Sequence, residues 1–141
     1  MKKNPLFLFV ALCVCFCSCS KDKEELIVGT WQVTQTNFIS NEDHQVVSEY
    51  DSSDGDWLFC FKEDHTGWVL ADQDTMPFSY VLSGNNLTFS VREMPDGVSK
   101  DQGVYELTMT IEQLDENTLH TYIETVMRDI EGTYHYHMKK R

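Results

Sequence analysis

A strict alternation of apolar and polar residues, broken by short turn sequences, is the feature that most constrains the fold of this chain. The clearest example is the pair of alternating runs at 76–82 and 87–91, joined by Ser83-Gly84-Asn85-Asn86. A period of two is typical of β-strands with one buried face, and Gly-Asn sequences favour tight turns. No helical period longer than two turns appears after Leu26. We therefore predict an all-β protein built from antiparallel hairpins.

Similar alternation recurs along the rest of the chain, which predicts eight or nine strands in total. The other runs are at about 28–38, 45–50, 57–61, 68–71, 105–114, 118–127 and 133–138. Short, evenly spaced strands suit an up-and-down meander better than a Greek key. There is no internal repeat and no room for a second domain.

The first predicted strand carries a glycine and a tryptophan on one face. In a period of two, Ile27, Gly29, Trp31 and Val33 point to the same side. A glycine allows a sharp bend in the backbone, and a large ring two residues later can plug the end of a small barrel. We expect this stretch to form the closed end of the barrel.

Three motifs resemble those of lipocalin-like domains. They are Gly29-Thr30-Trp31, the hairpin at 61–67, and the pattern Tyr-x-Leu-x-Gly-Asn-x-Leu-Thr at 80–88. The hairpin departs from the usual Phe-x-x-Asp-Gly-Thr-Gly at His65, where the family has glycine, and histidine tolerates a positive φ less well. The resemblance covers residues 26–139. It implies that residues 26–141 form an antiparallel, up-and-down, eight- to nine-stranded lipocalin-like β-barrel.

The first residues read as an export signal. Lys2 and Lys3 precede an apolar segment at 6–16, and small residues flank Cys19. The apolar segment is too short to span a membrane. The pattern resembles a bacterial lipoprotein signal, which implies cleavage after residue 18 and lipid on Cys19, with Cys15 and Cys17 as rival positions. We expect a charged tether at 19–25 and anchoring to the outer membrane, on its periplasmic face or at the cell surface.

Charge and cysteine content restrict the partners further. The chain has 23 acidic and 11 basic residues, for a net charge of −12. Such a chain is a poor partner for nucleic acid. Once the signal is removed and Cys19 is lipidated, only Cys60 remains, so no intramolecular disulfide is possible. Cys60 lies between two phenylalanines, which favours packing over nucleophilic chemistry.

No sequence motif indicates catalysis or a cofactor. We find no nucleophile elbow, no His-Glu-x-x-His and no phosphate-binding glycine loop, so we predict a non-enzyme without a cofactor. His135 and His137 could chelate a metal together with His120. No cysteine or carboxylate spacing supports such a site, and a half-exposed sheet face is the favoured interpretation, so we predict no metal site.

Aromatic residues dominate the predicted inward positions, and they allow two interpretations. They are Trp31, Trp57, Phe59, Phe61, Phe78, Tyr80, Phe89, Tyr105, Tyr134 and Tyr136. The interior of an eight-stranded barrel can be filled by its side chains or can hold one small ligand. From the residues alone, a lined pocket and a filled core are equally favoured.

The resemblance implies the first of these, because lipocalin-like proteins typically bind small apolar molecules in the mouth of the barrel. The candidate cavity residues are Trp31, Phe59, Phe61, Phe78, Tyr80 and Tyr105, with the loop Glu93–Gly103 as a lid. The alternative is a filled-core surface module that binds a protein or glycan through its loops.

Overall fold

The computed structural model describes residues 21–51, 57–91 and 105–141, which form one short helix and nine strands. The elements are α1 (Lys23–Ile27), β1 (Gly29–Ser40), β2 (Val46–Asp51), β3 (Leu58–Phe61), β4 (Thr66–Ala71), β5 (Asp74–Ser83), β6 (Asn86–Val91), β7 (Tyr105–Leu114), β8 (Thr118–Met127) and β9 (Ile130–Lys140). The predicted signal at 1–18, the lipidation site Cys19 and the lid Glu93–Gly103 lie outside the described residues.

The sheet closes on itself. Each strand from β3 to β8 pairs with the next one along the chain. The first strand, β1, pairs with both β3 and β9. These eight strands make a closed antiparallel barrel, and β2 is an additional strand on the second half of β1. The predicted all-β, up-and-down meander of eight to nine strands is confirmed. Because every strand of the closed barrel lies within residues 29–140, the barrel is complete without the first 20 residues.

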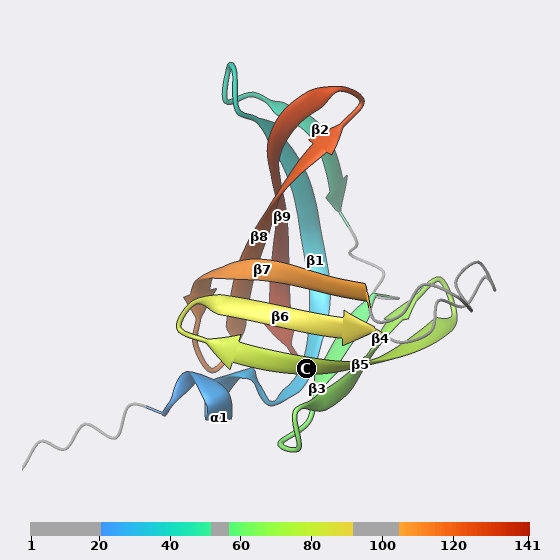
Figure 1. The fold of residues 1–141 in the computed structure, drawn as a ribbon, viewed down its shortest axis with the longest axis vertical. Helices are drawn as coiled ribbons and strands as arrows, with labels where there is room; N and C mark the ends of the chain where they lie inside the picture. The colour runs from blue at the N-terminus through green and yellow to red at the C-terminus, as the bar shows by residue number, and fades with distance from the viewer. Residues whose placement is uncertain (1–20, 52–56, 92–104) are drawn as a thin grey trace, which may run out of the picture.

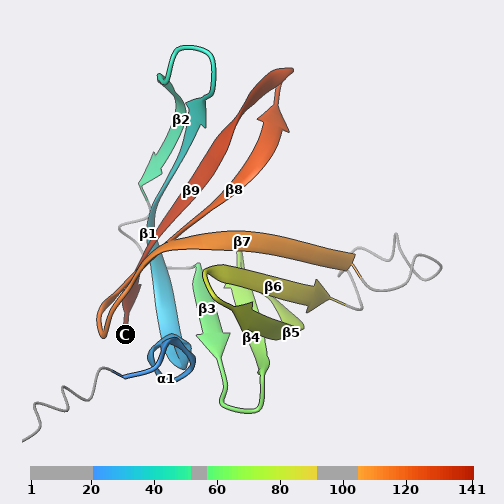
Figure 2. The same ribbon diagram turned by 60° about the vertical axis from the view of Figure 1, so that its left-hand side comes forward.

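The strands differ in length, and this gives the molecule two parts (Figures 1 and 2). β3, β4 and β6 are short, whereas β1, β8 and β9 continue beyond them, with β2 beside them, as a sheet extension at the top of Figure 1. A β-bulge in β1 between Val33 and Gln35 changes which residues face inward. Trp31 and Val33 are buried before it, and Thr36 and Phe38 after it.

The hairpin of β5 and β6 has the predicted partners. Tyr80 pairs with Phe89 and Leu82 with Leu87, and the turn contains Gly84 at φ +61°. The β3–β4 turn has His65 at φ +62°, a backbone conformation that glycine adopts more readily than histidine. Asp64 holds the turn, since its carboxylate accepts hydrogen bonds from the backbone nitrogen and the hydroxyl of Thr66, at 3.1 and 2.6 Å.

α1 covers one end of the barrel, and part of the expected tether belongs to it. Residues 23–25, which are part of the predicted charged tether, form the first turn of α1. Ile27, at the end of this helix, is fully buried. Gly29 follows at φ +134°, a conformation that glycine adopts readily, and this turns the chain into β1. Lys21 contacts Glu116 at 2.8 Å. The residues just before β1 therefore contact the barrel.

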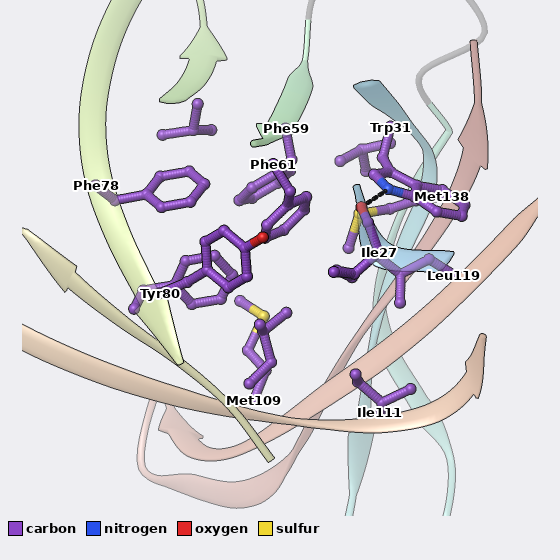
Figure 3. Close-up of a cluster of buried hydrophobic side chains, with 14 of the residues drawn as sticks. Ile27, Trp31, Phe59, Phe61, Phe78, Tyr80, Met109, Ile111, Leu119 and Met138 are labelled. Carbon is purple, nitrogen blue, oxygen red and sulfur yellow. Dashed lines mark hydrogen bonds between the residues drawn. The ribbon is translucent and has the colours of Figure 1, made fainter. Parts of the chain in front are cut away.

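The closed end has a compact, hydrogen-bonded core. Trp31 is fully buried with Leu119 and Met138 close to it, and its indole nitrogen donates to the carbonyl of Ile27 at 2.7 Å (Figure 3). Lys140 lies over the Trp31 ring, with Nζ 5.0 Å from the ring centroid, and donates to the carbonyl of Leu26 at 3.0 Å. The predicted inward face of the first strand is thus the floor of the barrel.

Candidate functional site

A cavity of about 250 Å³ remains inside the barrel at the end opposite α1. Its walls come from β3 to β7 and from β9, at the positions that alternate toward the interior. The lining residues are Trp57, Phe59, Val69, Ala71, Met76, Phe78, Phe89, Val91, Tyr105, Leu107, Met109 and Tyr136. Within the described residues, the lining contains no charged side chain. An apolar, concave site of this kind is the usual form of a small-molecule pocket.

The six predicted cavity residues divide into two groups. Phe59, Phe78 and Tyr105 line the cavity, whereas Trp31, Phe61 and Tyr80 are not among its lining residues. Figure 3 shows Phe59, Phe61, Phe78 and Tyr80 gathered on one side of the interior, with Trp31 on the other. The cavity therefore occupies only part of the volume that the aromatic residues enclose.

Phe61 and Tyr80 fill the barrel at the α1 end, where Phe61 pairs with Gly29 and Tyr80 borders the hollow beside α1. Their rings meet edge to face, with centroids 5.1 Å apart, and only 2% of each side chain is exposed. The Tyr80 hydroxyl donates to the carbonyl of Lys62 at 2.7 Å, so its polar atom is satisfied. Burial raises the pKa of Tyr80, and the nearby Glu24 and Asp64 act in the same direction. These two rings belong to the filled core.

Tyr105 lies at the rim. It is the first residue of β7, and 54% of its surface is exposed although it contributes to the cavity lining. Its position at a strand end explains why the predicted inward orientation is only partly realised: no neighbouring turn covers it within the described residues.

Several lining residues were missing from the predicted set although their alternation marked them as inward-facing. Trp57, Phe89 and Tyr136 are the aromatic ones. Phe78 and Phe89 meet edge to face at 5.0 Å, and Trp57 and Tyr136 do so at 5.7 Å. For all of these residues, the alternation with a period of two was the sequence signal of an inward orientation. Which inward ring borders an empty volume depends on the distance between strands, and the pattern does not contain that distance.

Tyr136 is the polar side chain that stands out in this lining. It lies on β9 between two fully or nearly fully buried threonines of the neighbouring strands, Thr36 and Thr121. Burial, and to a smaller extent the nearby Tyr134, raise the pKa of Tyr136 to about 12. The phenol therefore stays protonated at physiological pH and can donate a hydrogen bond.

Two larger hollows have more polar linings. One, of about 610 Å³ beside α1, includes Glu24, Glu25 and Glu63. The other, of about 820 Å³ on β4 to β6, includes Lys62 and Trp68 with several hydroxyl side chains. No three His, Cys, Asp or Glu side chains within the described ranges lie where they could share a metal ion. The three histidines of β8 and β9 lie on the outer face, where His135 contacts Glu112 at 3.3 Å.

The sequence and the fold also match known proteins. The family model of the lipocalin-like domain matches residues 27–121. The chain belongs to the lipocalin-like domain family. This family consists generally of non-catalytic binding proteins. The match begins in α1 and ends in β8, so it includes the floor and most of the cavity wall.

A solved structure shows the same lipocalin-like fold. The crystal structure of a lipocalin-like protein from Bacteroides uniformis aligns with a TM-score of 0.53 and 16% sequence identity, over 82% of this chain and 98% of that one. At this identity the likeness concerns the fold. No curated protein matches the sequence. None of the helices in the described part of the chain has the length and apolar character needed to cross a membrane.

Proposed function

We propose that this lipocalin-like protein binds a small apolar molecule in the barrel cavity. The observation that carries the proposal is the apolar cavity of about 250 Å³ that remains after the aromatic side chains have packed. Burial of apolar ligand surface against such walls contributes about 25 cal/mol per Å². The cavity lies at one end of the barrel, where several of the lining strands begin or end.

The cavity also separates this proposal from the filled-core alternative. A filled barrel would bury all its inward rings as Phe61 and Tyr80 are buried, and it would leave no lined volume. Here Trp57, Leu107 and Tyr136 are only partly buried, although they face inward from the walls. Partly exposed aromatic and aliphatic side chains around a concave volume favour ligand binding over a purely structural core.

Naphthalene is a suitable probe, because it is neutral, apolar and of the size of two fused rings. Equilibrium dialysis of residues 20–141 is expected to show one bound naphthalene per chain. Ala71 lines the cavity and is half-buried, so Ala71→Trp places an indole in the volume and should abolish binding. Val81→Trp is the matched control, since Val81 faces outward on β5 with 63% exposure, and it should bind normally. Absence of binding, or equal binding by both variants, would contradict the proposal.

We also propose that the protein is anchored to the outer membrane through lipid on Cys19. The support is the sequence: a basic start, an apolar segment and small residues around the cysteine. Residues 21 and 22, just before α1, would then separate the barrel from the bilayer.

Labelling with an alkyne-palmitate in a Gram-negative host tests this anchor. Cys19→Ala should lose the label completely, because the acylated thiol is gone, whereas Cys17→Ala should keep it. A label that persists in Cys19→Ala and disappears in Cys17→Ala would move the anchor to the rival cysteine. Absence of label in the unaltered protein would refute lipidation.

A further inference from the structure

Among the described residues, the hydroxyls of two tyrosines in the cavity lining, Tyr105 and Tyr136, have no protein partner, and Tyr105 lies at the exposed rim, where water can reach it. The Tyr80 hydroxyl donates to the carbonyl of Lys62, and the Tyr134 hydroxyl contacts the Thr36 hydroxyl at 3.0 Å. Tyr136, by contrast, has only ring contacts, to Trp57 and to Tyr134 at 5.7 and 5.0 Å. A polar group in a largely apolar setting costs free energy unless it finds a partner. The hydroxyl is therefore available to whatever occupies the cavity, water or a ligand.

Charge restricts the chemistry of that occupant. Among the described residues, the lining holds no lysine, arginine or histidine. From these residues a carboxylate or phosphate would gain no cation in exchange for its lost water, and the net charge of −12 on the chain repels anions further. A neutral molecule meets neither penalty. The raised pKa of Tyr136 also favours an uncharged ligand, since its phenol remains an uncharged hydrogen-bond donor.

The volume of the cavity and the chemistry of its walls restrict the ligand further. An apolar cavity of about 150 Å³ accommodates benzene, and the present volume is about 250 Å³. That volume suits one ring or two fused rings, and it is small for a long acyl chain or a porphyrin. The walls present ring edges and faces, as in the perpendicular pair Phe78 and Phe89, together with the thioethers of Met76 and Met109. Aromatic guests make favourable contacts with both.

We propose that the cavity binds an uncharged molecule of one or two fused aromatic rings that carries a single hydroxyl or carbonyl group, and that Tyr136 hydrogen-bonds this group. The proposal rests on the proposed function of the cavity and specifies its ligand class. Tyr136 is the residue that selects the polar group, and the surrounding rings bind the apolar part.

Four probes of similar size separate the possibilities: naphthalene, 2-naphthol, 2-naphthoate and phenyltrimethylammonium. The last is included because aromatic cages also bind quaternary ammonium ions. Isothermal titration at pH 7 on residues 20–141 should show 2-naphthol binding at least tenfold more tightly than 2-naphthoate or the ammonium probe. It should also bind more tightly than naphthalene, which has the same rings but no hydroxyl.

The Tyr136→Phe variant removes the hydroxyl and keeps the ring. We expect it to weaken 2-naphthol binding by about threefold to tenfold, as for one neutral hydrogen bond, and to leave naphthalene binding unchanged. Tyr122→Phe is the matched control, because Tyr122 lies beside His135 on the outer face of the sheet, and it should change neither affinity. Thermal unfolding followed by circular dichroism verifies that both variants are folded.

The outcomes separate the ligand class from the cavity function. Equal binding of 2-naphthol by the unaltered protein and Tyr136→Phe would refute the role of Tyr136 while naphthalene binding still upheld the cavity. Binding of 2-naphthoate or phenyltrimethylammonium as tight as that of 2-naphthol would refute the uncharged class. Failure of naphthalene and of all three other probes would refute the cavity function itself.

Discussion

The two ends of the barrel interior are built from the same kinds of residue but are completed differently. At the α1 end, Trp31 is fully buried and its indole nitrogen is bonded to the carbonyl of Ile27. At the cavity end, Trp57 is only partly buried and meets Tyr136 edge to face, and both rings line a volume that the described side chains leave open. The first end has its polar atoms satisfied by the chain itself. The second leaves both volume and a hydroxyl for a ligand.

This difference indicates how a small barrel can combine stability with binding. A barrel of eight strands has room for little more than its own side chains. The floor concentrates the packing: α1 closes it, and Lys140 fixes α1 through the carbonyl of Leu26. The opposite end can then leave aromatic surface partly exposed without loss of the fold. Phe61 and Tyr80 belong to the packed α1 end, since Phe61 pairs with Gly29 and Tyr80 borders the hollow beside α1.

The largest expected effect comes from the same substitution at the two ends. Trp31→Ala should lower the free energy of unfolding by about 3–5 kcal/mol, because it opens a cavity in a fully packed core. Trp57→Ala should cost about 1–2 kcal/mol, since the ring already borders empty volume. Urea denaturation of residues 20–141 and both variants measures this. Equal losses would contradict the division into a packed end and a binding end.

The affinity for naphthalene should also distinguish the two tryptophan variants. Trp57→Ala should weaken binding, whereas Trp31→Ala should leave it unchanged at temperatures where the variant is folded. A loss of affinity in Trp31→Ala under those conditions would mean that the two ends are coupled through Phe61 and Tyr80.

The smallest expected effect concerns the outer face of β9, which belongs to neither end. The pKa of His137 is lowered, mainly by burial and also by His120 and His135, while Glu112 acts in the opposite direction. The folded state therefore takes up a proton less readily than the unfolded state. Stability is fully present above the ordinary histidine pKa of about 6.5 and decreases as the pH falls through the lower folded value.

We expect the unfolding free energy to fall by less than about 1 kcal/mol between pH 7.5 and pH 5, because water screens a half-exposed ring. His137→Gln should reduce this pH dependence, and His44→Gln, in an exposed turn, serves as the control. Naphthalene affinity should not change over the same range, since His137 points away from the cavity. An affinity that follows the stability would connect the outer face to the binding end.

Much of the fold was predictable because its determinants are local. The period of two in 76–82 and 87–91 predicted the hairpin, and the register Tyr80 to Phe89 follows from the short turn at Gly84. The positive φ of His65 was likewise predictable from its place in a hairpin motif. The helix α1 was not predictable from the sequence, because a helix of five residues is too short to show a helical period. This helix depends on Ile27 packing against the barrel.

The sequence by itself determined the fold class, the family and the inward face of the strands that have no β-bulge, since alternation and turn chemistry act over a few residues. Only the tertiary structure decided which rings fill the barrel and which border the cavity. Trp31 and Trp57 have similar patterns around them, yet Trp31 is fully buried at the α1 end and Trp57 is only partly buried. The volume left between strands depends on β-bulges, as at Val33 and Gln35, and on contacts between residues far apart in the chain. A local sequence pattern contains neither the positions of the β-bulges nor the contacts between distant residues.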